Sequence, residues 1–169
     1  VQVYHVWDGG GTVCCSILGA DFLPASSELV QVAQNAIDPP PGQGLGLGLA
    51  PIGAQVTVTA PQTVPVDISA TLTLASGHEL ETVQQPAQDA VSAYLLQIRK
   101  NWDVNISSTA IAYSAEVYLA RVLAALISLD GFVNVSALTL NGIAADMALQ
   151  QTGALQQVPV LGKVELHGT

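Results

Sequence analysis

Hydrophobic and polar residues alternate through most of residues 50–74, APIGAQVTVTAPQTVPVDISATLTL. Apolar side chains fall on even-numbered positions from Ala54 to Ala60 and again between Val64 and Leu74. This period of two predicts half-buried β-strands, because successive side chains of a strand point to opposite faces of its sheet. Pro61 lacks an N–H group and predicts a break between two strands, one for each of two sheets.

The residues before this stretch predict a strand, a second strand, a helix and a third strand. Residues 1–7 and 12–18 are strand-like, and residues 8–11 tolerate a tight turn, so the first two strands should form a hairpin. The helix ends at Asp38, where three consecutive prolines force an extended chain. Its apolar residues share one face: Leu29, Val30, Ala33, Ala36 and Ile37.

Alternating glycine and leucine occupy residues 42–49, a composition that favours neither a stable helix nor a packed strand. The glycines fit neither phosphate-binding pattern, G-x-G-x-x-G or G-x-x-x-x-G-K-[ST], and no helix begins after them to hold an anion. We therefore predict a flexible arm that contacts a neighbouring protein. Its candidate contact residues are Leu45, Leu47 and Leu49.

Two further helices are predicted in the second half of the chain. The first has a T-x-x-Q capping box at Thr82 and Gln85, ahead of an apolar face that runs from Val83 to Ile98. The second spans residues 114–127 and is apolar on nearly every side, so we expect it to be covered on several sides.

A turn at Asn141 and Gly142 separates the first two of three final strands, which are predicted at residues 132–140, 143–149 and 158–166. The pattern as a whole predicts an α+β protein of two small modules, residues 1–60 and 61–169. Each module is expected to hold a mainly antiparallel sheet with helices packed on one face.

Composition changes this picture by pointing to contacts with other proteins. Only 10% of the 169 residues are charged, against about 25% in an average soluble protein, and 50% are apolar. We therefore expect part of the surface to be buried against other chains. The net charge of −9 repels phosphate backbones, so nucleic acid is not an expected partner. No apolar run reaches the roughly 18 residues of a spanning helix, so a membrane is not an expected partner either.

No catalytic or metal-binding constellation is recognisable. His78 and Glu79 precede a helix but lack the second histidine of an H-E-x-x-H metal motif. An enzyme would need a polar cleft that brings this pair to Asp103. Adjacent Cys14 and Cys15 point to opposite faces of a strand, which suits free thiols. We predict no catalysis, no cofactor, no metal and no small-molecule substrate.

Trp102, just past the end of the first long helix, is a further candidate contact residue. Large aromatic side chains concentrate binding energy where they are desolvated. Tyr94 and Tyr118 are on predicted helix faces, so we expect them to fill the core instead.

The order of several segments carries a resemblance to a known family. These segments are G-T-V at residues 11–13, L-x-A-D-x-x-P-A-S-x-E-L-V at 18–30, A-P-I-G-A-x-V-T-V at 50–58 and V-P-V-L-G-K-V at 158–164. In this order they resemble the C-terminal part of the baseplate J-like proteins of contractile phage tails and prophages. The resemblance extends over nearly the whole chain, whereas the N-terminal portion of such proteins is absent.

The resemblance implies a structural subunit of a tail baseplate that joins copies of itself and other baseplate subunits. It implies neither enzymatic activity nor a cofactor, and it implies assembly in the bacterial cytoplasm followed by a place in the virion tail. The chain lacks an initiator Met, in line with a piece of a longer protein. The alternative hypothesis is a module that binds protein or carbohydrate on a phage tail or cell surface, which would group exposed aromatic side chains in a groove.

Overall fold

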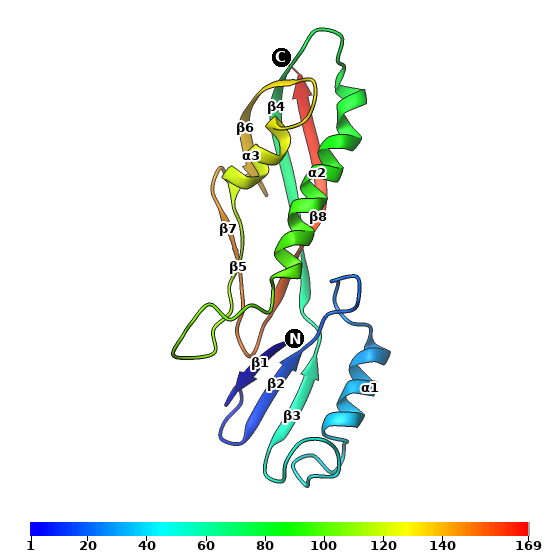
Figure 1. The fold of residues 1–169 in the computed structure, drawn as a ribbon, viewed down its shortest axis with the longest axis vertical. Helices are drawn as coiled ribbons and strands as arrows, with labels where there is room; N and C mark the ends of the chain where they lie inside the picture. Colours follow the sequence, from blue (N-terminus) through cyan, green and yellow to red (C-terminus); the bar gives the residue numbers. More distant parts are fainter. Residues whose placement is uncertain (169) are drawn as a thin grey trace. The chain divides into compact units, whose positions relative to one another are not determined.

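The computed structural model describes residues 1–168 and divides into two compact units (Figure 1). Its helices and strands confirm the predicted α+β class. Each unit combines segments that are far apart in the sequence. Those of the first unit are residues 1–63, 101–115 and 150–158. Those of the second are residues 64–100, 116–149 and the chain from Pro159 on.

The sheet of the first unit has the strand order β1-β2-β3. β1 (Gln2–His5) and β2 (Thr12–Ser16) pair in antiparallel fashion as the predicted hairpin. β3 (Gln55–Thr59) is parallel to β2, whereas the sequence predicts mainly antiparallel sheets. The difference arises because the crossover through helix α1 (Ser27–Ile37) returns the chain to the sheet in the direction of β2.

Helix α1 packs on one face of this sheet, as predicted. It begins after Ser26, whose Oγ accepts the N–H of Leu29 at 3.2 Å. Buried Ala50, Val56 and Val58 form the core of the contact. Partly buried side chains from the sheet and the helix surround that core: Val13, Cys15, Ile17, Val30, Ala33 and Ile37.

A buried amide holds strand β1 to the two later segments of the first unit. The side-chain amide of Gln2 donates to the Trp102 carbonyl at 2.7 Å and to Gln151 Oε1 at 3.0 Å. The Trp102 indole N–H donates to the same Gln151 oxygen at 2.9 Å. The Tyr4 hydroxyl donates to Gln2 Oε1 at 2.6 Å, and burial raises the pKa of Tyr4, so this donor keeps its proton at neutral pH. This network joins residues about 100 and 150 positions apart in the sequence.

The sheet of the second unit has the order β6-β4-β8. Its central strand is β4 (Gln62–Leu74), which follows the break at Pro61, so β3 and β4 belong to different sheets as predicted. β6 (Phe132–Leu140) is antiparallel to β4. β8 (Gln157–Gly168) runs in the same direction as β4, so this sheet too is mixed (Figure 1).

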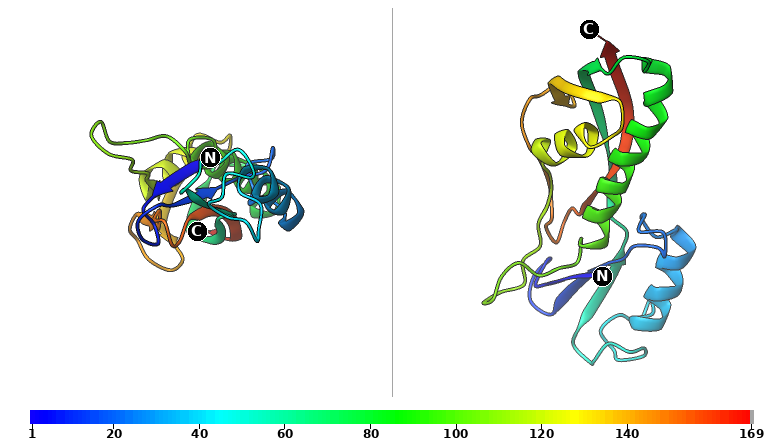
Figure 2. Two further views of the ribbon diagram at one scale, coloured as in Figure 1. Left: turned by 90° about the horizontal axis from the view of Figure 1, so that it is seen from below. Right: turned by 45° about the horizontal axis from the view of Figure 1, so that its top comes forward.

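Four even-numbered residues of β4 are buried, as their alternation predicts: Val66, Ile68, Ala70 and Leu72. Helices α2 (Leu80–Lys100) and α3 (Leu119–Ile127) lie on the same face of the sheet (Figure 2). The predicted apolar face of α2 is confirmed by its buried residues, which are Val83, Ala87, Val91 and Leu95.

Helix α2 begins earlier than predicted, at Leu80, so Thr82 and Gln85 form no capping box. The turn before it is closed by a hydrogen bond from His78 N to the Ala75 carbonyl, and it leads the chain directly into the helix. Thr82 Oγ1 instead donates to the Glu79 carbonyl at 2.8 Å.

The second predicted helix is also shorter than residues 114–127. Ala115–Val117 form strand β5, which pairs with β7 (Met147–Leu149), and α3 begins only afterwards. Its first N–H, that of Leu119, donates to Asp146 Oδ1 at 2.7 Å. This acceptor comes from a distant part of the chain and stabilises the helix N-terminus there.

Helix α3 and the strand after β6 differ from the prediction in two more ways. The buried residues of α3 are Val122 and Leu126, so the chain itself covers one side of the helix and not several. The strand predicted at residues 143–149 shortens to β7, because the residues after the Asn141-Gly142 turn are exposed. β7 pairs with β5 and does not continue a meander beside β6.

Cys14 and Cys15 on β2 are free thiols, as predicted. Their burial predicts low reactivity, which can be measured. Burial raises the pKa of both thiols, although a hydrogen bond with Thr59 acts in the opposite direction on Cys14. Because the thiolate is the reactive form, both should react with iodoacetamide much more slowly in the native chain than in urea at pH 8. The native rate should still increase above the ordinary thiol pKa of about 8.5. Equal rates in both states, measured by mass spectrometry, would contradict the burial of these thiols.

Candidate protein-binding surfaces

A buried carboxylate, that of Asp38, organises the loop that carries the predicted contact leucines. Asp38 is 0% exposed and directly follows helix α1. Its Oδ1 accepts the N–H of Gly44 at 2.9 Å, and its Oδ2 accepts the N–H of Val56 at 2.8 Å. A buried charge is tolerated only where hydrogen bonds replace its water. The carboxylate therefore fixes the loop to strand β3.

Two glutamines complete the outer edge of β3. Gln34 Nε2 and Gln43 Nε2 donate to the Val56 carbonyl at 2.9 and 3.0 Å. Gln34 Oε1 accepts the N–H of Val58 at 2.8 Å. With Asp38, these side chains take the hydrogen-bonding positions that a fourth strand would occupy. The N–H and carbonyl groups of Val56 and the N–H of Val58 therefore all have hydrogen-bond partners, which protects this edge from pairing with another strand.

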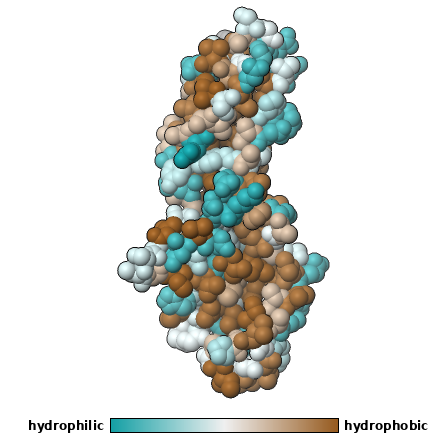
Figure 3. Space-filling model, viewed as in Figure 1, coloured by the Kyte–Doolittle hydropathy of each residue, from teal (hydrophilic) through white to brown (hydrophobic). Residues whose placement is uncertain are grey.

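The leucine loop, defined here as residues 42–53, presents four large apolar side chains to solvent. Leu45, Leu47, Leu49 and Ile52 are 64%, 68%, 82% and 83% exposed. The loop is anchored to the end of α1, because the N–H groups of Leu49 and Ala50 donate to the carbonyls of Ala36 and Ile37. The face of the first unit seen in Figure 3 is largely hydrophobic and includes the end where this loop lies.

Glycine is required at one position of this anchor. A Cβ atom on Gly48 would lie 2.8 Å from the Ala36 carbonyl oxygen, closer than real Cβ contacts allow. The glycines that predict a flexible arm therefore also permit close approach of the loop to the helix end.

Trp102, the other predicted contact residue, is placed inside the first unit. It is 1% exposed, and its indole N–H is bonded to Gln151. In this conformation the ring stabilises the chain and offers little surface to a partner. The exposed candidates are the three leucines of the loop.

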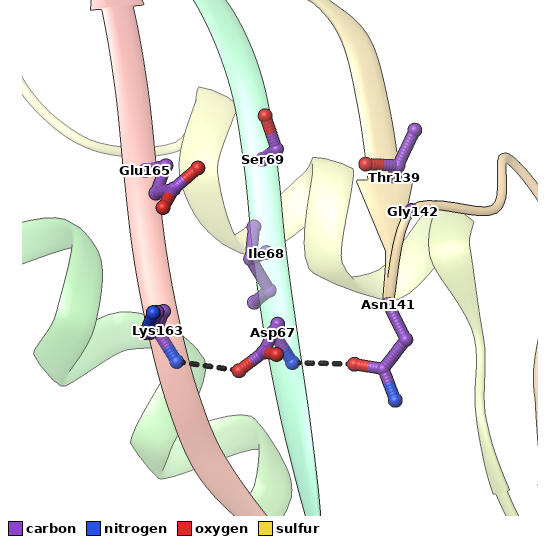
Figure 4. A pocket seen from close by; sticks show the side chains of 8 residues that line it. All are labelled: Asp67, Ile68, Ser69, Thr139, Asn141, Gly142, Lys163 and Glu165. Atoms are coloured by element: carbon purple, nitrogen blue, oxygen red, sulfur yellow. Dashed lines mark hydrogen bonds between the residues drawn. The ribbon is translucent and has the colours of Figure 1, made fainter.

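A polar hollow lies on the open face of the second sheet, opposite the helices (Figure 4). Asp67 lies on the central strand, β4, between Lys163 and Asn141, and it connects both neighbouring strands. Asp67 Oδ1 accepts the N–H of Lys163 on β8 at 2.7 Å. The N–H of Asp67 donates to the side chain of Asn141, at the end of β6, at 2.6 Å. A Cβ on Gly162 would collide with Asp67 Oδ1, so this contact requires glycine beside Lys163.

The groups weighed as catalytic are divided between the two units. His78 and Glu79 belong to the second unit and Asp103 to the first. Over residues 1–168, no cluster of three or more His, Cys, Asp or Glu side chains could hold a metal ion. Within that same range, no helix is long and apolar enough to cross a membrane.

Asp38 and Asp67 are the structural residues that the sequence did not reveal. Asp38 stands where a helix stops before three prolines, which is sufficient to explain an aspartate locally. Asp67 falls on the solvent side of an alternating strand, where any polar residue fits. The partners of Asp67 are 74 and 96 residues away, and Asp38 is bonded to Gly44 in the irregular loop and to Val56, 18 residues away, so local spacing gives no signal.

Comparison with known proteins relates this architecture to a family. The model of the family "Baseplate J-like protein C-terminal domain" matches residues 66–167. The chain belongs to this family. The match starts in β4 and runs into β8, so it covers all three strands of the second sheet, whereas α1 and the leucine loop precede it.

Two curated relatives come from Bacillus subtilis (strain 168). "Phage-like element PBSX protein XkdT" is 38% identical over 90 residues, which are 53% of this chain and 25% of the relative. "Uncharacterized protein YqbT" is 40% identical over 91 residues, or 54% and 26% of the two chains. The chain spans about a quarter of the length of these relatives. The baseplate J-like family is one of structural phage proteins, which supports a structural role in a phage tail.

Replacing Asp38 tests the anchor of the leucine loop. Asp38→Ala leaves the N–H groups of Gly44 and Val56 without their acceptor, and Val56 is buried. We expect the free energy of unfolding to fall by about 2–3 kcal/mol in a urea titration. Asp38→Asn retains one acceptor oxygen and should lose less. Asp130→Ala removes an exposed carboxylate and should change stability by less than about 0.5 kcal/mol. Equal losses at both positions would exclude a special role for Asp38.

A double-mutant cycle tests the contact between Gly162 and Asp67. Gly162→Ala should destabilise the chain by about 1–3 kcal/mol, because the added methyl displaces the Asp67 carboxylate. Once Asp67→Ala has removed that carboxylate, the same glycine substitution should cost about 1 kcal/mol less. Chemical denaturation of the four proteins measures this coupling. Strictly additive losses would show that the two residues act independently.

Proposed function

We propose that this chain is a structural subunit of a phage or prophage tail baseplate. In this proposal it assembles through protein–protein contacts with copies of itself and with other baseplate subunits. The observation that carries the proposal is the match of residues 66–167 to the baseplate J-like C-terminal domain. The name of one relative, a phage-like element protein, supports a prophage or phage origin.

The surface of the chain supports assembly through contacts. Its charged fraction is 10%, and large apolar side chains are exposed on the leucine loop and on helix α3, where Leu123 and Ile127 are both more than a third exposed. Large contiguous apolar patches on a protein surface mark sites of association. The proposed role needs neither a cofactor nor a substrate, since the chain acts by joining its neighbours.

Electron microscopy of the parent particle tests this role. Antibodies raised against the chain, carrying gold, should label purified tails at the baseplate end, after assembly of the particle in the bacterial cytoplasm. Antibodies against the sheath provide a matched control, because they label the length of the tail. Label on the capsid or along the sheath, or no label on intact or disrupted particles, would contradict the proposal.

A further inference from the structure

An uncharged groove runs along helix α1 of the first unit, with a volume of about 670 Å³. Its apolar lining comes from the chain before α1, from the helix itself, from the proline run and from the end of β3: Ala25, Val30, Pro40, Val58 and Ala60. Gln31 and Asn35, two exposed residues of α1, add uncharged polar groups to the lining. None of the residues that line this groove belongs to the leucine loop of the same unit.

We propose that this groove binds the leucine loop of a second copy of the chain. The inference rests on the proposed function and names the surface through which copies contact one another. Each copy would then use two different patches, a loop and a groove. Where one such contact joins each pair, it is heterologous and leaves one free loop and one free groove, so it continues to further copies or closes into a ring. Two reciprocal contacts about a two-fold axis would instead close a dimer.

Charge is the first argument for a second copy as the occupant. Every copy carries a net charge of −9, so two copies repel one another wherever their acidic surfaces meet. Neither the residues of the groove nor residues 42–53 include a charged side chain. Contact between these two patches therefore places no carboxylate against another, and it buries apolar groups on both sides.

The rigidity of the loop is the second argument. Asp38 and the end of α1 hold the loop by main-chain hydrogen bonds, so its leucines are presented before any partner arrives. A pre-organised segment loses less conformational entropy on binding than a free arm does. Because Gln34, Gln43 and Asp38 occupy the hydrogen-bonding positions at Val56 and Val58, the occupant binds through side-chain packing there and not as an added strand.

Two charged variants and their mixture test the contact by sedimentation equilibrium of the 169-residue chain at rising concentration. Leu47→Lys places a cation on the loop, and Asn35→Asp places an anion in the groove. Each variant alone should self-associate at least about tenfold more weakly than the wild type. An equimolar mixture should recover association, because the lysine of one copy meets the aspartate of the other.

Matched controls carry the same changes in the second unit, on side chains of similar exposure. Ile143→Lys and Asn134→Asp should leave self-association as in the wild type, and circular dichroism melts should verify that all variants are folded. A wild-type chain that is monomeric at millimolar concentration, an unaffected Asn35→Asp variant, or a mixture no better than its components would each overturn the proposal. These outcomes are independent of gold labelling, which tests the location in the particle alone.

Discussion

The buried carboxylate of Asp38 is the constraint on which the first unit depends. A charge removed from water must have its oxygens bonded, and the groups that bond them belong to the loop and to β3. Meeting this requirement fixes the path of the chain between α1 and β3. It also closes the outer edge of the sheet and leaves the leucines of the loop no core to enter. The hydrogen bonds of this one carboxylate thus determine both that the edge of β3 is protected and that the leucines of the loop are exposed.

The second unit uses an acidic side chain for a related purpose. Asp67 lies on the open face of its sheet and connects β4 to the strands on both sides, where the sheet has no helix to stabilise it. The two aspartates differ in exposure, because Asp38 is buried and Asp67 is exposed. Both replace strand-to-strand hydrogen bonds with side-chain bonds to main-chain N–H groups. Although the chain has few charged residues, two of them bond main-chain groups that connect its strands and loops.

The sequence predicted features that depend on local periodicity. Four even-numbered residues of β4 are buried because alternation is a property of the strand itself, and the apolar face of α2 follows from helical spacing in the same way. Features that depend on distant partners were missed. Val117 belongs to a strand because β7 lies beside it, and Leu119 starts a helix because Asp146 accepts its N–H. Of the candidate contact residues, the leucines are exposed, whereas a network with Gln2 and Gln151 encloses Trp102.

The first unit is built from three separate segments of the chain, and this affects the order in which the protein can fold. When residues 1–100 have left the ribosome, the segments of the hairpin and of α1 are available. The buried amide of Gln2 still lacks both of its acceptors, because Trp102 and Gln151 come later in the chain. The unit nearest the start of the chain is therefore completed only after residue 151 emerges. Pairings over such long separations form slowly and keep unpaired surface exposed meanwhile. Within these 169 residues the ribosome reaches this unit first, yet the unit needs segments made much later to be complete.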